Sequence, residues 1–235
     1  MAKTDLKNKV LLITGGSSGM GKETAFMAKE QGAVVAVLSN RQDELDTLPA
    51  GFIKLHADIR IPYEVSSAVE SLIQQTGRID MLVNSAGVSL WKDFTEMDES
   101  FWDLIYDVNV KGTFLVTQAV ARQMIKQKNG FILNVASMSG LKSGMLKASA
   151  YASSKWAIVG FSRNLHLELK PHGIKVACFC PGSTRTTLHE KANSPDMDLM
   201  LDPEDVAHTI LFMLTAPDKG HIQLLAMPAM FEEWR

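Results

Sequence analysis

The sequence has few of the residues that build metal centres and disulfide frameworks. It contains two cysteines, Cys178 and Cys180, and the single residue between them fits neither a C-x-x-C redox pair nor a metal site. The six histidines are scattered without the spacing of metal ligands. We therefore expect two buried, reduced thiols and no bound structural metal.

Long apolar runs and an excess of charge of either sign are also missing. No uninterrupted apolar stretch approaches the ~20 residues of a membrane-spanning helix, and the segment from Met1 to Lys9 is polar, without the apolar core of a signal peptide. The net charge of -2 gives no electrostatic basis for binding nucleic acid or an anionic membrane. We expect a cytoplasmic protein that binds neither.

The residues that are present are typical of one globular domain. Of the 235 residues, 46% are hydrophobic and 21% are charged, and no stretch has the composition of a linker, a repeat or a low-complexity insert. This length lies within the range of one large α/β domain. We predict a single domain over residues 1–235.

A glycine-rich stretch near the start, Lys9 to Gly21, is the strongest local signal. Its first part, Val10 to Ile13, is a continuous apolar run, as expected of a strand buried on both faces of a parallel sheet. Four glycines follow, and a helical pattern begins at Met20, so the backbone can turn sharply and bring its N–H groups to a bulky anion. The spacing G-x-x-x-G-x-G is a variant of the dinucleotide-binding turn. A glycine-rich connection without a ligand is the alternative.

Short apolar runs alternate with helical patterns along most of the chain. This alternation predicts a doubly wound, Rossmann-like parallel sheet with helices on both faces, in which ligands bind beyond the carboxyl ends of the strands. The predicted strands cover residues 10–13, 33–38, 52–56, 81–83, 131–136 and 175–179. The predicted helices cover residues 20–31, 42–48, 62–77, 98–128, 151–169 and 202–214.

Several polar or small residues follow the predicted strand ends, so we expect them along one rim of the sheet. They are Ser39, Asp58, Asn84 to Gly87, Ser137 and Pro181. Asp58 is either a turn and capping residue or a ligand for an adenine ring. Asn109 lies within a helical pattern, where asparagine is locally unfavourable, which indicates a solvated surface, a bend or a water site.

Tyr151 and Lys155 are four residues apart on a predicted helix and therefore share one face. A free tyrosine has a pKa of ~10 and transfers protons poorly near neutral pH unless a cation favours the phenolate. Lys155 is placed to be that cation, and the Ser137 hydroxyl can hold a carbonyl oxygen. The hydride for carbonyl reduction must come from a cofactor, because no side chain supplies one. These residues together indicate nicotinamide-dependent interconversion of carbonyl and alcohol.

Several groups of residues occur in the order and at the intervals of one enzyme family, over about the first four-fifths of the chain: Thr14 to Gly21, Asp58, Asn84 to Gly87, Asn109, Ser137, Tyr151 to Lys155 and Pro181 to Thr186. On these residues the chain resembles the short-chain dehydrogenase/reductase family. The resemblance implies an NAD(P)(H)-dependent oxidoreductase acting on a small carbonyl or alcohol substrate. It also implies a homo-oligomer, a tetramer, in which the helices at 98–128 and 151–169 pack across subunits.

The resemblance assigns catalysis to Asn109, Ser137, Tyr151 and Lys155, with Asn109 anchoring a proton-relay water. Lys155 would also hold the nicotinamide ribose. Cofactor contacts are expected from a larger set that lines the pyrophosphate, adenine, ribose and carboxamide: Gly15, Ser17, Ser18, Gly19, Met20, Gly21, Ser39, Asn40, Arg41, Asp58, Ile59, Asn84, Ala86, Gly87, Tyr151, Lys155, Pro181, Gly182, Thr184 and Thr186.

The residues after the second predicted strand favour NADP(H) over NAD(H). Ser39 lacks the acidic group that would repel a 2′-phosphate, Asn40 can donate a hydrogen bond, and Arg41 can approach with a charge-assisted bond. Family members often carry the basic residue at the position of Asn40 instead.

Two segments depart from the family or resist assignment. Ser85 replaces the second asparagine of the usual Asn-Asn-Ala-Gly, and residues 221–235 lack the common glycine-rich tail. We expect the substrate pocket in the connections 88–94, 138–150 and 183–201, the last with a lid ending at the predicted N-cap Asp202. Trp91, Met138, Met145 and Leu188 indicate an apolar lining or local packing. A dinucleotide-binding sensor without activity and a non-redox dehydratase or epimerase are the alternative functions.

Overall fold

The central feature of the fold is one sheet of 7 strands, all parallel, in the order β3-β2-β1-β4-β5-β6-β7. The structure is a computed structural model that describes residues 6–142, 145–186, 197–217 and 219–230. The strands are β1 (Val10–Thr14), β2 (Val34–Ser39), β3 (Ile53–His56), β4 (Met81–Asn84), β5 (Gly130–Val135), β6 (Ile174–Pro181) and β7 (Leu224–Met227). The strand order reverses between β1 and β4, as in the predicted doubly wound, Rossmann-like fold, which is confirmed.

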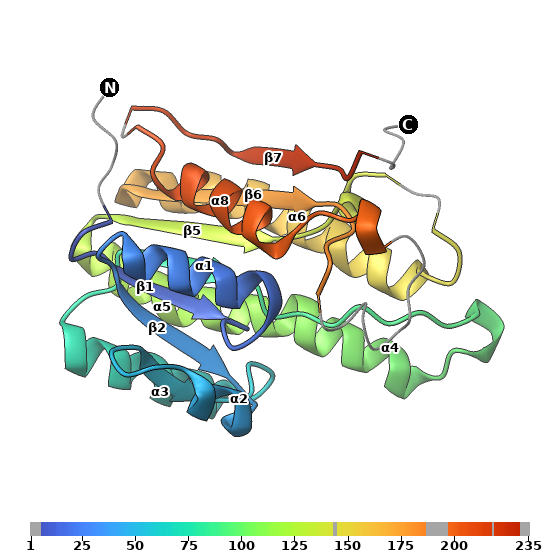
Figure 1. Cartoon of the computed structure of the whole chain (residues 1–235), viewed down its shortest axis with the longest axis horizontal. Coiled ribbons are helices and arrows are strands. Elements are labelled where there is room, and N and C mark those ends of the chain that lie inside the picture. Colours follow the sequence, from blue (N-terminus) through green and yellow to red (C-terminus); the bar gives the residue numbers. More distant parts are fainter. Residues whose placement is uncertain (1–5, 143–144, 187–196, 218, 231–235) are drawn as a thin grey trace.

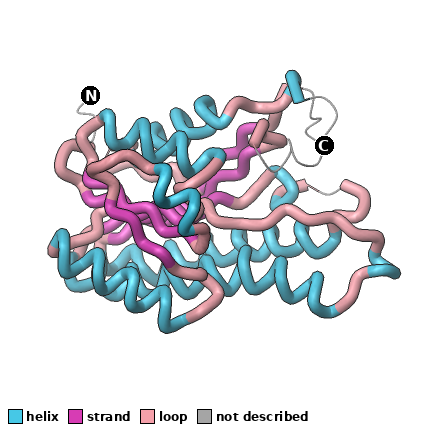
Figure 2. The backbone as a smooth tube through the Cα atoms, turned by 60° about the horizontal axis from the view of Figure 1, so that its bottom comes forward, coloured by secondary structure: helices cyan, strands magenta, loops and turns pink. Residues whose placement is uncertain are grey.

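Helices cover both faces of the sheet, so the strands form the middle of three layers (Figures 1 and 2). One face packs against α1 and α8, and the other packs against α3 and α5. The helices in the described ranges are α1 (Gly19–Glu30), α2 (Gln42–Thr47), α3 (Pro62–Thr76), α4 (Glu99–Tyr106), α5 (Thr113–Gln127), α6 (Ser149–Leu169) and α8 (Pro203–Leu214).

The apolar run in β1 shows why these strands read as continuously hydrophobic. All five of its residues are buried. Leu11 and Ile13 pack into the core beneath α1 and α8, whereas Val10 and Leu12 pack into the core beneath α3 and α5. A strand that is covered on both faces needs apolar side chains at every position, and this removes the alternation of a half-exposed strand.

The segment around Asn109 is not a regular α-helix. A π-helical stretch, Asp107–Gly112, joins α4 to α5, and Asn109 is buried within it with 1% of its surface exposed. The region predicted as one helix, 98–128, is therefore helical from Glu99 to Gln127, but the π-helical stretch interrupts the α-helical hydrogen bonding. The solvated-surface interpretation of Asn109 is wrong, because its side chain makes internal hydrogen bonds that the wider turn permits.

Strand β7 was not predicted from the sequence. It pairs with β6 at the edge of the sheet, with Cys178 opposite Leu224 and Cys180 opposite Ala226. A four-residue edge strand of half-buried residues carries little pattern to recognise. The two cysteines are free and buried, as expected. The hydrogen bond between the Cys180 and Cys178 thiols, together with burial, raises the pKa of the Cys180 thiol, which keeps it protonated.

Helix α8 begins at the predicted residue but without the predicted capping hydrogen bond. Asp202 occupies the N-cap and Pro203 begins the helix, yet the Asp202 side chain makes no capping hydrogen bond. Its carboxylate instead forms an ion pair with Arg185. Among the described helices, none combines the length and the apolar character that crossing a membrane requires.

Candidate functional site

A cavity of about 1740 Å³ opens at the carboxyl ends of the strands, the end toward which the arrows of Figure 1 point. Single small-molecule pockets are about 300–1,000 Å³, so this cavity has room for a large cofactor together with a substrate. Most of the residues that the sequence singled out line it: Gly15, Ser17, Ser18, Gly19, Met20, Gly21, Ser39, Asn40, Arg41, Asp58, Ile59, Ala86, Gly87, Ser137, Tyr151, Lys155, Pro181, Gly182, Thr184 and Thr186.

The turn after β1 requires glycine at two positions. Gly15 has φ +66, and a Cβ there would lie 2.8 Å from the Cα of Ala86. A Cβ on Gly21 would lie 2.4 Å from the carbonyl oxygen of Gly15. The Thr14 hydroxyl accepts hydrogen bonds from the backbone N–H groups of Ser85 and Ala86, both at 3.2 Å. The turns after β1 and β4 are therefore held tightly together at the floor of the cavity.

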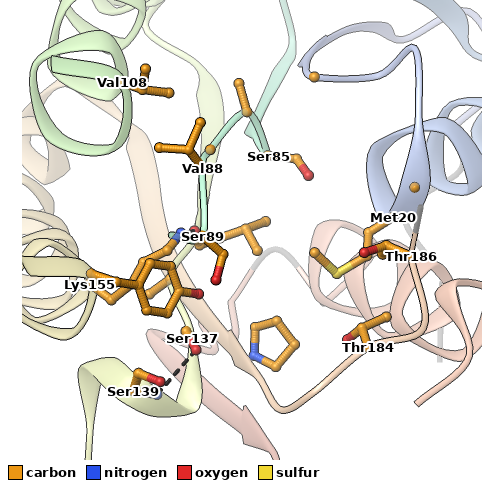
Figure 3. Close-up of a pocket in the computed structure, with 18 of the residues that line it drawn as sticks. Met20, Ser85, Val88, Ser89, Val108, Ser137, Ser139, Lys155, Thr184 and Thr186 are labelled. Atoms are coloured by element: carbon orange, nitrogen blue, oxygen red, sulfur yellow. Dashed lines mark hydrogen bonds between the residues drawn. The ribbon is translucent and has the colours of Figure 1, made fainter. Parts of the chain in front are cut away.

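The first turn of α1 faces this floor and is suited to an anion. It contains no acidic residue, and the Ser18 side chain at the N-cap does not accept a capping hydrogen bond. The backbone N–H groups of the first turn are thus available, and the helix dipole favours negative charge at that point. Met20 lies beside Thr184 and Thr186 on this side of the pocket (Figure 3). This donor set fits a dinucleotide pyrophosphate.

On the other side of the pocket, Lys155 lies with Ser137 and Ser139 (Figure 3). The Lys155 ammonium is 5.8 Å from the centre of the Tyr151 ring and donates to the carbonyl oxygen of Val135 at 3.1 Å. Ser137 Oγ accepts a hydrogen bond from the backbone N–H of Ser139 at 3.1 Å. A hydroxyl whose oxygen already accepts keeps its own proton for donation, so Ser137 can donate into the cavity.

Two of the three predicted asparagines, Asn84 and Asn109, do not line the cavity. The Asn109 amide bonds both backbone groups of Val88, accepting from its N–H at 2.8 Å and donating to its carbonyl at 3.0 Å. It also donates to Ser154 Oγ at 3.0 Å. Asn84 is buried and donates to Thr117 Oγ1 and Asn134 Oδ1, both at 2.8 Å. The Asn109 side chain therefore fixes the connection after β4, and that of Asn84 joins β4 to α5 and β5.

A polar cluster stands at the end of β2, where Ser39 was predicted to face the adenosine ribose. Ser17 Oγ lies 2.9 Å from Ser39 Oγ and donates to Glu44 Oε2 at 2.7 Å. The other carboxylate oxygen of Glu44 is 3.0 Å from the Arg41 guanidinium. Glu44 lines the cavity and was missed from the sequence. The available signal was its position three residues after Arg41 on one helical turn.

Asp58 lies next to this cluster and is held by a neighbour. Its carboxylate accepts from the Arg60 backbone N–H at 2.9 Å and from the Arg60 guanidinium at 2.5–3.0 Å. The hydrogen bonds and charge of Arg60 lower the pKa of Asp58 against the opposing effect of burial. The turn interpretation of Asp58 is thus supported by its contacts, and the residue also lines the cavity.

The remaining wall of the cavity is largely apolar. Trp91, Met138 and Met145 line it, as the sequence suggested, and Phe94 and Leu146 join them. Phe94 is 75% exposed and Leu146 is 89% exposed, so the apolar wall continues out to the mouth. Leu188, the fourth residue named from the sequence, lies outside the described residues.

Comparison with known proteins identifies the family. A family profile described as short chain dehydrogenase matches residues 9–197. The chain belongs to the short-chain dehydrogenase/reductase family. Membership supports an oxidoreductase that acts on CH–OH groups with NAD(P).

Relatives of this short-chain dehydrogenase/reductase cover nearly the whole chain. It is 36% identical to the (2S)-[(R)-hydroxy(phenyl)methyl]succinyl-CoA dehydrogenase subunit BbsD of Thauera aromatica, over 92% of this chain and 93% of the relative. It is also 36% identical to the 3-oxoacyl-[acyl-carrier-protein] reductase FabG of Thermotoga maritima, over 88% and 91%. A solved structure, ElxO with NADP bound, superposes with a TM-score of 0.85 at 25% identity, covering 94% of this chain and 98% of that chain.

Proposed function

We propose that this protein is an NADP(H)-dependent oxidoreductase that interconverts a ketone or aldehyde with an alcohol, using Tyr151 as the general acid and base. The observation that carries the proposal is the convergence of Tyr151, Lys155 and Ser137 on the cavity that also receives the first turn of α1. An anion site and a proton-transfer site within one cavity fit a dinucleotide cofactor and a carbonyl substrate. When bound, the nicotinamide supplies the hydride that no side chain provides.

Each of the three side chains has a separate task in the proposed reaction. The Tyr151 hydroxyl gives a proton to the substrate oxygen during reduction and takes it back during oxidation. Ser137 donates a hydrogen bond to the same oxygen and orients it. The buried Lys155 ammonium uses one donor on Val135, and its remaining donors could serve Tyr151 and the ribose of a bound cofactor. Asn109 is proposed to support a proton-relay water through its backbone, since its side chain binds Val88.

The preference for NADP(H) is supported by the absence of an acidic residue at the end of β2. Ser39 occupies this position, and Asn40 and Arg41 follow it along the cavity. We expect Ser39→Asp to weaken NADPH binding, because the new carboxylate would repel the 2′-phosphate. Steady-state kinetics that give the natural chain a higher kcat/KM with NADH would overturn the preference.

The apolar wall supports an apolar carbonyl substrate, and a panel of ketones and aldehydes tests the function directly. We expect oxidation of NADPH, followed by its absorbance, with substrates that carry alkyl or aryl groups. Tight binding of the cofactor with no turnover on a broad panel would favour a sensor without activity. Turnover of a substrate without net consumption of the cofactor would favour a dehydratase or epimerase.

We also propose that the chain is a single domain that acts in the cytoplasm as a homotetramer. Large apolar side chains are exposed on three neighbouring helices: Trp102 on α4, Phe114 on α5, and Trp156 and Leu167 on α6. Burying such surfaces between copies is favourable. Sedimentation at micromolar concentration should give an oligomer, and a monomer would contradict this. The proposed lid connection at 183–201 is tied at its base by a bridge between Thr184 and Leu201.

A further inference from the structure

A carboxylate stands in the part of the cavity where a 2′-phosphate would have to bind. It belongs to Glu44 in α2, five residues beyond the strand-end position, and its side chain is 20% exposed. It accepts from Ser17 Oγ at 2.7 Å and contacts the Arg41 guanidinium at 3.0 Å. The Ser17 hydroxyl and the Arg41 guanidinium, beside the end of β2, are therefore engaged with Glu44.

The direction of these hydrogen bonds follows from simple chemistry. An ionised carboxylate only accepts, so the Ser17 hydroxyl must give its proton to Glu44. The Ser39 hydroxyl then donates to Ser17 Oγ and accepts from the Arg41 backbone N–H at 3.2 Å. Ser17 and Ser39 are buried, with 5% and 7% of their surfaces exposed. The hydrogen bonds of this cluster therefore form a chain from Ser39 through Ser17 that ends on the carboxylate of Glu44.

We propose that Glu44 is a specificity-determining residue that opposes binding of the 2′-phosphate. It thereby reduces the factor by which the protein prefers NADP(H) over NAD(H). This inference rests on the proposed dinucleotide function. The Arg41 guanidinium proposed to bind the 2′-phosphate is held by Glu44 in the structure, as is the Ser17 hydroxyl. A 2′-phosphate that approached Arg41 would also meet the negative charge of Glu44. A ribose with a free 2′-hydroxyl carries no charge, and it can donate to the same carboxylate.

An acidic side chain can disfavour a 2′-phosphate from two different positions in this fold. An acidic residue at the end of β2 would repel a 2′-phosphate from a fixed position on the strand, but this chain has Ser39 there. Glu44 comes from the following helix, so it can leave Arg41 by a change of side-chain rotamer without moving the sheet. The natural chain is therefore expected to bind both cofactors. Its preference for NADP(H) should be smaller than it would be if Arg41 were not paired with Glu44.

The test is to compare binding of paired nucleotides to the natural chain, Glu44→Gln and Glu44→Ala. Isothermal titration with 2′,5′-ADP, 5′-AMP, NADP⁺ and NAD⁺ gives a ratio of dissociation constants for each pair. Gln keeps the length of Glu without its charge, and Ala removes the contact as well. We expect both variants to shift the two ratios about tenfold toward the 2′-phosphorylated member, as for release of one charge-assisted contact.

Asp43→Asn is the matched control. Asp43 is the exposed preceding residue of α2, so this variant makes the same change in net charge one position before the carboxylate that contacts Ser17 and Arg41. The control should leave both ratios within about twofold of the natural chain, because an exposed charge is well screened. Equal ratios in the natural chain and both Glu44 variants, or an equal shift in Asp43→Asn, would overturn the role of Glu44.

The same titrations distinguish this inference from the proposed function. A natural chain that binds NAD⁺ more tightly, but whose ratio shifts in Glu44→Gln, would refute the preference for NADP(H) and support the role of Glu44. Failure of the natural chain to bind any of the four nucleotides would refute both. The binding readout does not require a substrate, so it stands apart from turnover.

Discussion

The Lys155 ammonium donates a 3.1 Å hydrogen bond to the carbonyl oxygen of Val135, the last residue of β5. This contact ties α6 to the strand that leads into Ser137, so the distance between Lys155 and Ser137 is set by the sheet. Lys155 is 8% exposed, and an ammonium in such a place needs partners to offset its desolvation. The pairing explains how the cation is held beside Tyr151.

Lys155→Met is expected to lose turnover and to weaken cofactor binding together. The variant removes the ammonium that lies beside the Tyr151 ring and also the donors proposed for the ribose. We expect kcat to fall by at least about 10²-fold, with a Kd for the cofactor about tenfold higher. Cofactor titration and single-turnover hydride transfer measure the two effects. An unchanged Kd would refute the ribose contact.

Asn109→Ala is expected to destabilise the fold as well as reduce turnover. It removes the amide that now binds the part-buried N–H and carbonyl groups of Val88 and the buried Ser154 hydroxyl, and a buried polar group left unpaired costs about 1–3 kcal/mol. We expect a loss of about 2–4 kcal/mol in the free energy of unfolding. Urea denaturation measures it. Asn164→Ala, which removes an exposed contact within α6, is the control and should cost less than about 1 kcal/mol.

The doubly wound fold was predictable because strands that are buried along their whole length, such as β1 and β4, form nearly continuous apolar runs. The rim residues followed from it, since the carboxyl ends of parallel strands share one edge. Sequence reasoning did not find β7 or the π-helical stretch around Asn109, because a short edge strand and a local change of helix type leave no periodic signal. It missed Glu44 because the side chain reaches Ser17 only after two distant segments are brought together.

The stability of the protein should fall as pH is lowered from about 7 to about 5, through His166 and His221. Their rings lie 4.4 Å apart. Burial lowers the pKa of His166, with a further effect of Lys170. Burial also lowers the pKa of His221, against the opposing effect of its hydrogen bond to the Val176 carbonyl and with smaller lowering effects of His166 and Lys175. Nδ1 of His166 accepts from the Val176 N–H at 3.4 Å, so a proton there would oppose that donor.

The loss of stability at low pH follows from the linkage between proton binding and unfolding. Histidine in the unfolded chain binds its proton near pH 6.5, whereas these two folded histidines bind theirs at lower pH. The stabilisation is therefore present above pH 6.5 and is lost as pH falls through the folded values, by at most about 1.4 kcal/mol per pH unit for each residue. Urea denaturation across this range measures the slope. His166→Gln should reduce this slope, whereas His208→Gln, at an exposed position, should leave it unchanged.

Tyr151→Phe provides the sharpest test of the proposed chemistry, because it removes one oxygen and leaves the ring. The backbone carbonyl of Tyr151 that accepts from Ser154 Oγ at 2.7 Å is retained, so the start of α6 should keep its structure. We expect turnover to fall by about 10²- to 10⁴-fold, the usual effect of losing a general acid or base.

Cofactor affinity in Tyr151→Phe should stay near that of the natural chain, in contrast to Lys155→Met, because the proton is needed only at the substrate oxygen. Cofactor titration and single-turnover kinetics on both variants give the comparison. Tyr63→Phe, at a site that is 78% exposed on α3, should change neither quantity. Reduction of a good carbonyl substrate by Tyr151→Phe at the natural rate would remove Tyr151 from the proton-transfer step. The Ser137 hydroxyl would then be the next donor to test in the same assay.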